Sequence, residues 1–97
     1  MRYIVTATRI FDRWLASMRN PIAKAAVISR VRRVEHGNFG DHKSIRDSVS
    51  EMRIDVGSGY RVYYTIRNMH VVFLLCGGDK RTQQKDIERA IDIAKEI

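Results

Sequence analysis

The sequence predicts an α+β protein in which helices at both ends of the chain flank a block of antiparallel strands. Apolar and polar residues alternate along residues 51–56 and again along 60–66, which is the spacing of strands with one buried face. Residues 71–76 form an uninterrupted apolar run, and apolar residues recur at helical spacing on both sides of this block. The expected order is a strand, two helices, a possible edge strand, three strands and a closing helix.

The N-terminal part is expected to supply a short strand and a helical hairpin. Residues 3–6 have the pattern of the strand, and Thr8 is a good N-cap for a helix with one apolar face. Asn20 and Pro21 end that helix and begin another, with Asn20 as the N-cap and Pro21 at the first helical position. Gly37 is expected to stop the second helix.

The central hairpin is expected to turn at Gly57-Ser58-Gly59, where glycine tolerates a positive φ. If Val56 faces Tyr60 across this turn, the two alternating patterns agree on one core face. On that face the expected pairs are Ile54 with Val62 and Met52 with Tyr64. The other face is expected to be open, and the pairs on it are Asp55 with Arg61 and Arg53 with Tyr63.

The third strand of the block, residues 71–76, has no polar alternation and is expected to be central or covered on both faces. Asn68-Met69 is a plausible two-residue turn before it. That register groups Phe73 and Leu75 with the core set and puts Cys76 beside Arg61. Gly77-Gly78 is expected to end the strand.

Two further segments complete the expected fold. Residues 43–49 are expected to be an edge strand or an irregular approach to the hairpin. Thr82 is expected to cap the closing helix. The apolar stripe of that helix is Ile87, Ala90, Ile91 and Ala94.

Length and composition limit the class of protein. A chain of 97 residues fits one domain, residues 1–97. The net charge of +7 favours a polyanionic or acidic partner, although a basic surface that merely aids solubility explains it equally well. One cysteine excludes an internal disulfide and suits a reducing cytosol. Neither a signal peptide nor a membrane-spanning run is visible, so a cytoplasmic location is expected.

Several motifs occur in a joint order that resembles a known superfamily. They are Glu51-Met52-Arg53-Ile54, Gly59-Tyr60-Arg61-Val62-Tyr63-Tyr64, Leu74-Leu75-Cys76-Gly77-Gly78-Asp79-Lys80 and Thr82-Gln83 with Asp86-Ile87, preceded by Phe11, Trp14-Leu15 and Gly37-Asn38-Phe39-Gly40-Asp41 with Lys43. Together they resemble the RelE/ParE superfamily of type II toxins, and most of all its HigB-like branch, the addiction module killer proteins. Met52 stands where branch members often have Leu, and Cys76 lies in an otherwise aliphatic strand.

The resemblance implies a RelE-like fold, with a twisted antiparallel sheet of four to five strands, an N-terminal helical hairpin on one side and a C-terminal helix. It implies a growth-inhibiting toxin that cleaves mRNA on the ribosome. It also implies a cognate antitoxin encoded alongside, typically a helix-turn-helix protein. The superfamily includes inhibitors of DNA gyrase, so the fold alone leaves the target open.

Cleavage of RNA without a metal ion requires the negative charge of the phosphorane to be stabilised, and fixed cations on a sheet can do this. Arg61 and Lys80 match basic positions of the superfamily, and Arg53 lies beside Arg61 in the expected hairpin. The alternative for Arg61 is a cross-strand ion pair with Asp55, which at a surface stabilises little. The full set of expected RNA-phosphate contacts is Lys43, Arg53, Arg61, Lys80 and Arg81.

The groups that transfer protons are harder to assign from sequence. Tyr63 is expected either to stack on a base or donate a proton, or else to shield the sheet. Of the three histidines, His42 is nearest to the site in sequence and is the candidate for proton transfer. The histidines and Cys76 lack metal-ligand spacing, so neither a metal nor another cofactor is expected, and Cys76 is expected to be a buried thiol.

Three functional hypotheses remain. The first is a ribosome-dependent endoribonuclease toxin. The second is a gyrase-inhibiting toxin of the same fold, without nuclease chemistry. The third is a degenerate basic module that binds only nucleic acid or an antitoxin, and it predicts no growth defect on expression. All three predict salt-dependent binding to polyanions, so binding alone does not separate them.

Overall fold

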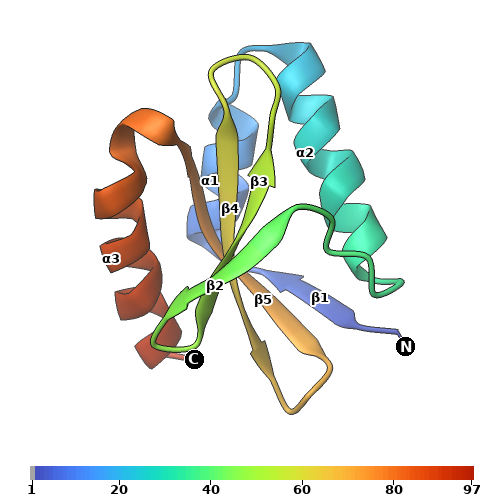
Figure 1. The fold of residues 1–97 in the computed structure, drawn as a ribbon, viewed down its shortest axis with the longest axis vertical. Coiled ribbons are helices and arrows are strands. Elements are labelled where there is room, and N and C mark those ends of the chain that lie inside the picture. Colours follow the sequence, from blue (N-terminus) through green and yellow to red (C-terminus); the bar gives the residue numbers. More distant parts are fainter. Residues whose placement is uncertain (1) are drawn as a thin grey trace.

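The computed structural model describes residues 2–97, which form a five-stranded sheet with helices on both faces (Figure 1). The elements in chain order are β1 (Ile4–Ala7), α1 (Arg9–Ser17), α2 (Pro21–Val34), β2 (His42–Arg46), β3 (Val49–Ile54), β4 (Tyr60–Arg67), β5 (Val71–Asp79), the short 3₁₀ turn η1 (Lys80–Thr82) and α3 (Gln83–Lys95). The predicted α+β class and order of elements are confirmed. Residues 42–46 supply the edge strand that was expected near 43–49.

The strands lie in the order β1-β5-β4-β3-β2. The pairs β2–β3, β3–β4 and β4–β5 are antiparallel, as expected, whereas β1 pairs with β5 in parallel. β5 is therefore an interior strand, and its continuous apolar run is explained because neighbours and helices cover it. The sequence pattern did not predict the parallel pairing of the N-terminal strand.

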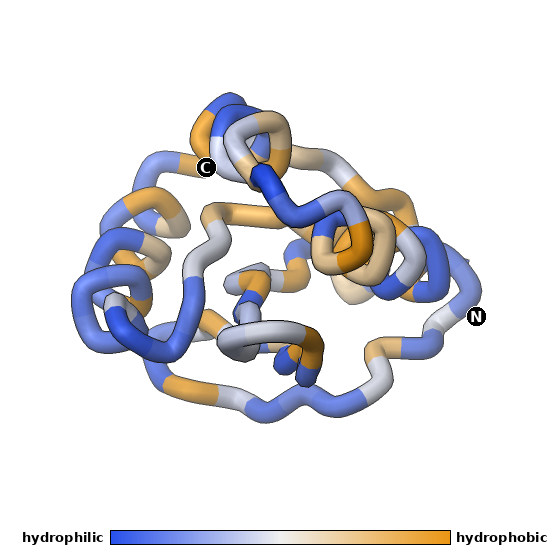
Figure 2. The backbone as a smooth tube through the Cα atoms, turned by 90° about the horizontal axis from the view of Figure 1, so that it is seen from above, coloured by the Kyte–Doolittle hydropathy of each residue, from blue (hydrophilic) through white to orange (hydrophobic). Residues whose placement is uncertain are grey.

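Two hydrophobic clusters pack on the two faces of the sheet. Phe11 of α1 and Val27 of α2 pack on one face, with Met52 and Val62 from the sheet. The apolar stripe of α3 packs on the other face, against Tyr63 and neighbouring strand residues. Figure 2 shows hydrophobic and hydrophilic residues alternating along the helices, as amphipathic helices require. The face that was expected to be open is thus covered in part by α3.

The register of the β3–β4 hairpin differs from the expected one by two residues. Ile54 pairs with Tyr60, and Arg53 pairs with Arg61. Residues 55–59 form the turn, where both glycines have positive φ, 59° at Gly57 and 84° at Gly59. A shift of two residues keeps every side chain on its expected face, because side chains alternate with a period of two. The shift makes all four predicted pairs wrong, because Met52 pairs with Val62, Glu51 pairs with Tyr63, and Asp55 leaves the ladder. The wrong pairs are Ile54 with Val62, Met52 with Tyr64, Asp55 with Arg61 and Arg53 with Tyr63.

The β4–β5 register is wrong by one residue, and this changes the faces. Arg67 pairs with Val71, so the turn contains three residues, including Asn68 and Met69, instead of two. A slip of one residue reverses the side chains. Leu74 therefore joins the cluster under α1 and α2, while Leu75 joins the cluster under α3, and the predicted placement of Phe73 and Leu75 with Met52 is wrong. Between Tyr64 and Tyr63 the register shifts by one further residue, so Cys76 pairs with Tyr63 and its expected contact with Arg61 is wrong as well.

Gly77 and Gly78 do not end β5, contrary to expectation. They continue the ladder opposite Val62 and Arg61. Side chains at both glycines would have no room, because a Cβ at Gly77 would meet the indole of Trp14 and one at Gly78 would meet the carboxylate of Asp86. The glycines allow close packing of α1 and α3 on the strand.

The helix caps mostly agree with prediction. Thr8 Oγ1 accepts a hydrogen bond from Phe11 N at 3.1 Å, and Asn20 Oδ1 accepts from the first backbone N–H groups of α2. Gly37, with φ at 85°, follows the end of α2. Thr82 stands at the N-cap of α3 but makes no cap bond to the backbone, because its hydroxyl donates to Asp86 Oδ2 at 2.6 Å.

Candidate functional site

A cleft of about 370 Å³ opens beside the β3–β4 turn, where the end of β5 meets it. Its lining residues are Asp41, Arg53, Ile54, Asp55, Gly59, Tyr60, Arg61 and Lys80. Three of the cations proposed from the sequence thus converge on one concave surface. Arg53 and Arg61 come from neighbouring strands, and Lys80 comes from the turn that follows β5.

Arg53 and Arg61 are directly opposite each other in the β3–β4 ladder. Like charges in this position repel unless a counter-charge separates them. Glu51 supplies it, with Oε1 at 3.6 Å from Arg61 Nε and Oε2 at 4.0 Å from Arg53 Nε. Arg53 also forms an ion pair with Asp41, Nη2 to Oδ1 at 2.9 Å. The expected partner of Arg61 was Asp55, and Glu51 takes that place.

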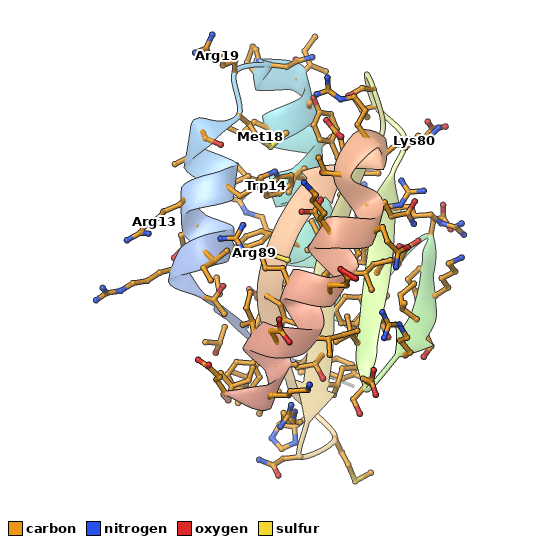
Figure 3. All side chains as sticks on the ribbon, turned by 90° about the vertical axis from the view of Figure 1, so that its left-hand side faces the viewer. Arg13, Trp14, Met18, Arg19, Lys80 and Arg89 are labelled. Carbon is orange, nitrogen blue, oxygen red and sulfur yellow. The ribbon has the colours of Figure 1, made fainter. Side chains whose placement is uncertain are left out.

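Lys80 reaches the cleft because the β3–β4 turn leaves room for its side chain. A Cβ at Gly59 would lie 3.1 Å from Lys80 Cε, so the aliphatic stem of the lysine runs over this glycine. Figure 3 shows Lys80 and Arg13 on opposite sides of the molecule, with Arg13 projecting from α1. The absence of a side chain at Gly59 therefore helps to set the path of Lys80.

Arg81 follows Lys80 in the sequence but does not line the cleft. Its guanidinium donates to Asp79 Oδ2 at 2.9 Å, and its side chain is 83% exposed. The hydrogen bond from Arg81 lowers the pKa of Asp79, although burial acts in the opposite direction. Asp79 also accepts from the backbone N–H of Arg81, which makes it the cap of η1. Arg81 is therefore not among the residues that line the cleft.

The structure does not bring Tyr63 to the cleft surface. Tyr63 is fully buried beneath α3, so the expectation that it lies exposed on an open face is wrong. Burial and, to a lesser extent, the charge of Glu51 raise the pKa of Tyr63 well above its ordinary value. Its hydroxyl has no hydrogen-bond partner among the described residues.

His42 and Lys43 also lie outside the cleft. His42 pairs with Met52 on β3, which puts it on the sheet face opposite to that of Arg53 and Arg61. Its Nδ1 lies 2.8 Å from the carbonyl oxygen of Gly40. Lys43 pairs with Glu51 and is exposed at the edge of the sheet. Neither residue is among those that line the cleft with Arg61.

Sequence reasoning missed four residues that shape the site. They are Tyr60, which lines the cleft, Asp41 and Glu51, which pair with its arginines, and Arg30. Arg30 reaches from α2 and donates to the carbonyl oxygens of Arg53 at 2.7 Å, Phe39 at 3.0 Å and Asp41 at 3.2 Å. Glu51 was detectable, because it precedes Arg53 by two positions and so shares its face. The contacts of Arg30 depend on tertiary structure alone.

Metal and thiol chemistry have little support in the described region. Within residues 2–97, no group of three or more His, Cys, Asp or Glu side chains is arranged to hold a metal ion. Cys76 is buried, as expected, and its Sγ lies 3.6 Å from the carbonyl oxygen of Asp86. Burial raises the pKa of this thiol to about 12, so it is protonated at neutral pH. No helix in residues 2–97 is both long and apolar enough to cross a membrane.

Comparison with known proteins shows the family to which this chain belongs. Residues 13–97 match the family described as phage derived protein Gp49-like (DUF891). The chain belongs to the Gp49-like family. An uncharacterized protein of Haemophilus influenzae is 50% identical to this Gp49-like chain over 93 residues, which are 96% of this chain and 94% of the relative.

Two solved structures resemble this Gp49-like protein in fold. One is a chain from the toxin–antitoxin complex RelBE2 of Mycobacterium tuberculosis, with a TM-score of 0.66 and 24% identity over 82% of this chain and all of that one. The other is a mutant of Escherichia coli toxin RelE in the free state, with a TM-score of 0.68 and 14% identity over 92% of this chain and 98% of that one. The expected RelE-like fold is confirmed.

Proposed function

We propose that this Gp49-like protein is the toxin of a type II toxin–antitoxin system and that it inhibits translation by cleaving mRNA on the ribosome. The observation that carries the proposal is the convergence of Arg53, Arg61 and Lys80 on one cleft. The RelE-like fold supports the toxin class, since both solved relatives are described as toxins or toxin complexes. A net charge of +7 favours binding to a polyanion such as RNA.

The proposed reaction is attack of a ribose 2′-hydroxyl on the adjacent phosphate, with departure of the 5′-oxygen. Arg53, Arg61 and Lys80 stabilise the negative charge that develops on the phosphorane. Arginine suits this task because its planar guanidinium offers paired N–H donors to phosphate oxygens. These three cations are the residues from the expected catalytic set that line the cleft.

Proton transfer is proposed for residues of the cleft itself. Tyr60 and Asp55 both line it, whereas His42 lies on the other face of the sheet and Tyr63 is buried. Asp55, which forms no salt bridge within the described chain, takes the proton of the 2′-hydroxyl, and the Tyr60 hydroxyl donates a proton to the departing 5′-oxygen. Bound mRNA and the ribosome then complete the alignment of the reacting groups.

The partner that silences the toxin is proposed to be a cognate antitoxin encoded beside it. One solved relative is described as a toxin–antitoxin complex, which supports this partner class. The motifs around Arg53 and Arg61 support the narrower proposal of a HigB-like toxin with a helix-turn-helix antitoxin. Action on ribosomes requires a cytoplasmic location.

The deciding experiment adds the purified protein to a reconstituted translation reaction and maps mRNA ends by primer extension, with and without ribosomes. We expect cuts aligned with codons only when ribosomes are present. Arg61→Ala is expected to abolish them, while Arg13→Ala, which removes the same charge from the exposed side of α1, leaves them unchanged. Loss of cutting in both variants would indicate that general charge, and not the cleft, is responsible.

Absence of cuts with intact translation would overturn the proposal. A DNA supercoiling assay then tests the alternative of a gyrase inhibitor with the same fold. Expression in cells separates both toxins from a degenerate module, which binds nucleic acid or antitoxin without slowing growth. Toxicity that survives substitution of Arg61 and Lys80 would favour the gyrase alternative.

A further inference from the structure

Glu51 is a carboxylate buried beneath the basic surface of the cleft. It is 0% exposed and is one of the two buried polar or charged residues in the described core. A buried carboxylate is costly unless cations and hydrogen bonds compensate for lost hydration. The compensating groups are the charges of Arg53 and Arg61, whose Nε atoms are too far from the carboxylate for a hydrogen bond, and the side-chain amide of Gln83, which donates to Oε1 at 3.4 Å.

The two oxygens of Glu51 are divided between the two arginines. Oε1 is 3.6 Å from Arg61 Nε, and Oε2 is 4.0 Å from Arg53 Nε. The carboxylate therefore lies next to both guanidinium groups, and both arginines line the cleft whereas Glu51 does not. Because Arg53 and Arg61 face each other across the β3–β4 ladder, they would repel without this shared counter-charge.

Gln83 belongs to the first turn of α3, whereas Glu51 belongs to β3. The contact between them joins the helix that covers this face of the sheet to the carboxylate behind the cleft. Packing of α3 excludes water from Glu51, and in such surroundings the attraction to the arginines is stronger than in water. The paired arginines are thereby held by the sheet and by α3 together.

We propose that Glu51 is a positioning residue that holds Arg53 and Arg61 side by side, with both guanidinium groups directed into the cleft. Glu51 is fully buried, so it acts on RNA only through the two arginines. This inference rests on the proposed function for its effect on RNA cleavage, but the arrangement of the arginines is testable without it. Displacement of a catalytic group by about 1 Å can reduce a reaction rate by about 10²-fold, and this is the size of effect we expect when the two arginines lose their shared carboxylate.

The kinetic test compares Glu51→Gln with Glu88→Gln, which removes the same charge from an exposed position on α3. In the ribosome reaction we expect Glu51→Gln to lower kcat by about 10²-fold while binding of a non-cleavable, 2′-deoxy-substituted mRNA stays the same or tightens. Loss of the negative charge of Glu51 favours binding to RNA, so the rate falls while the affinity does not. Glu51→Asp, which keeps the charge, is expected to recover part of the rate.

Circular dichroism measures the folded fraction of Glu51→Gln. If the rate falls only in proportion to the folded fraction, Glu51 has a structural role and the positioning role is overturned. Full activity of Glu51→Gln would overturn it as well.

A second measurement does not depend on activity. This measurement is the NMR spectrum of ¹⁵N-labelled wild-type protein, in which Arg→Lys variants assign the Nε–H signals of Arg53 and Arg61. We expect the chemical shifts of these two signals to differ from those of freely rotating arginines. Glu51→Gln is expected to move the Arg61 signal to the free position and the Arg53 signal by less, because Asp41 still pairs with Arg53, and Glu88→Gln is expected to move neither. Unchanged signals in Glu51→Gln would overturn the inference. Absence of RNA cleavage by the wild-type protein would instead overturn the proposed function.

Discussion

Trp14 of α1 lies against Gly77 of β5 so closely that a Cβ at the glycine would overlap the indole ring. The indole also approaches Tyr60, with ring centroids 6.5 Å apart, and Tyr60 lines the cleft. Figure 3 shows Trp14 on the side of α1 that faces the sheet. A glycine in the middle of a strand ladder thus allows a large aromatic side chain to pack beside the candidate site.

Gly77→Ala is expected to destabilise the protein by about 1–3 kcal/mol, because the added methyl group overpacks the contact with Trp14. The free energy of unfolding from urea titration measures this. Combining Gly77→Ala with Trp14→Ala is expected to cost less than the sum of the two single changes, since the smaller side chain relieves the overlap. Strict additivity would show that the indole does not determine the need for glycine.

Arg30→Ala is expected to lower the free energy of unfolding by about 2–3 kcal/mol, because three backbone carbonyl groups lose a charged donor. Partial burial of the guanidinium lowers the pKa of Arg30. Two of the carbonyls belong to Arg53 and Asp41, so cleavage of mRNA is expected to weaken as well.

Arg32→Ala on the same helix is the matched control for Arg30→Ala. Arg32 is exposed, and the change removes the same charge, so we expect less than about 0.5 kcal/mol. Similar effects of the two substitutions would mean that the carbonyl contacts of Arg30 contribute no more than its charge.

Stability is expected to fall in alkaline solution. Burial raises the pKa of Cys76 from 9.0 to about 12 and that of Tyr64 from 10.0 to about 12. Both groups are neutral when protonated, so the native state keeps its protons while the unfolded state loses them. The free energy of unfolding is therefore constant below pH 9 with respect to these two groups and falls as the pH rises from 9 to about 12. In the pH range where a group has lost its proton in the unfolded state but keeps it in the native state, the fall is about 1.4 kcal/mol per pH unit.

Urea unfolding between pH 7 and pH 11 tests this slope. Cys76→Ala is expected to remove the part of the decline that begins near pH 9, although the substitution also lowers stability at neutral pH through lost packing. A pH profile of Cys76→Ala parallel to that of wild type would contradict the assignment.

Met69→Gly is expected to stabilise the protein by about 0.5–1 kcal/mol. Met69 has φ of 67° and is 82% exposed, so the side chain contributes little packing and the backbone conformation is unfavourable for it. Met69→Ala keeps the Cβ and serves as the control, with no expected gain. The midpoints of thermal unfolding of the wild-type protein, Met69→Gly and Met69→Ala measure the effect. Equal midpoints would exclude backbone strain at this position.

Local patterns predicted most elements correctly, because caps and periodicity act over a few residues. Thr8, Asn20 and Pro21 mark the helix starts that the structure has, and the stripe of α3 is buried as expected. Prediction was wrong where one residue decides a register. The turn at Asn68 and Met69 contains a third residue, and neither side chain signals it in the sequence.

The candidate site divides in the same way. Alternation along the hairpin was sufficient to put Arg53 and Arg61 on one face, since side-chain direction in a strand has a period of two. It was not sufficient to show that α3 buries Tyr63 on that face, that Glu51 lies between the arginines, or that Arg30 holds the loop beside them. Those relationships join segments distant in the chain, and they arise only when the helices dock on the sheet and exclude water from it.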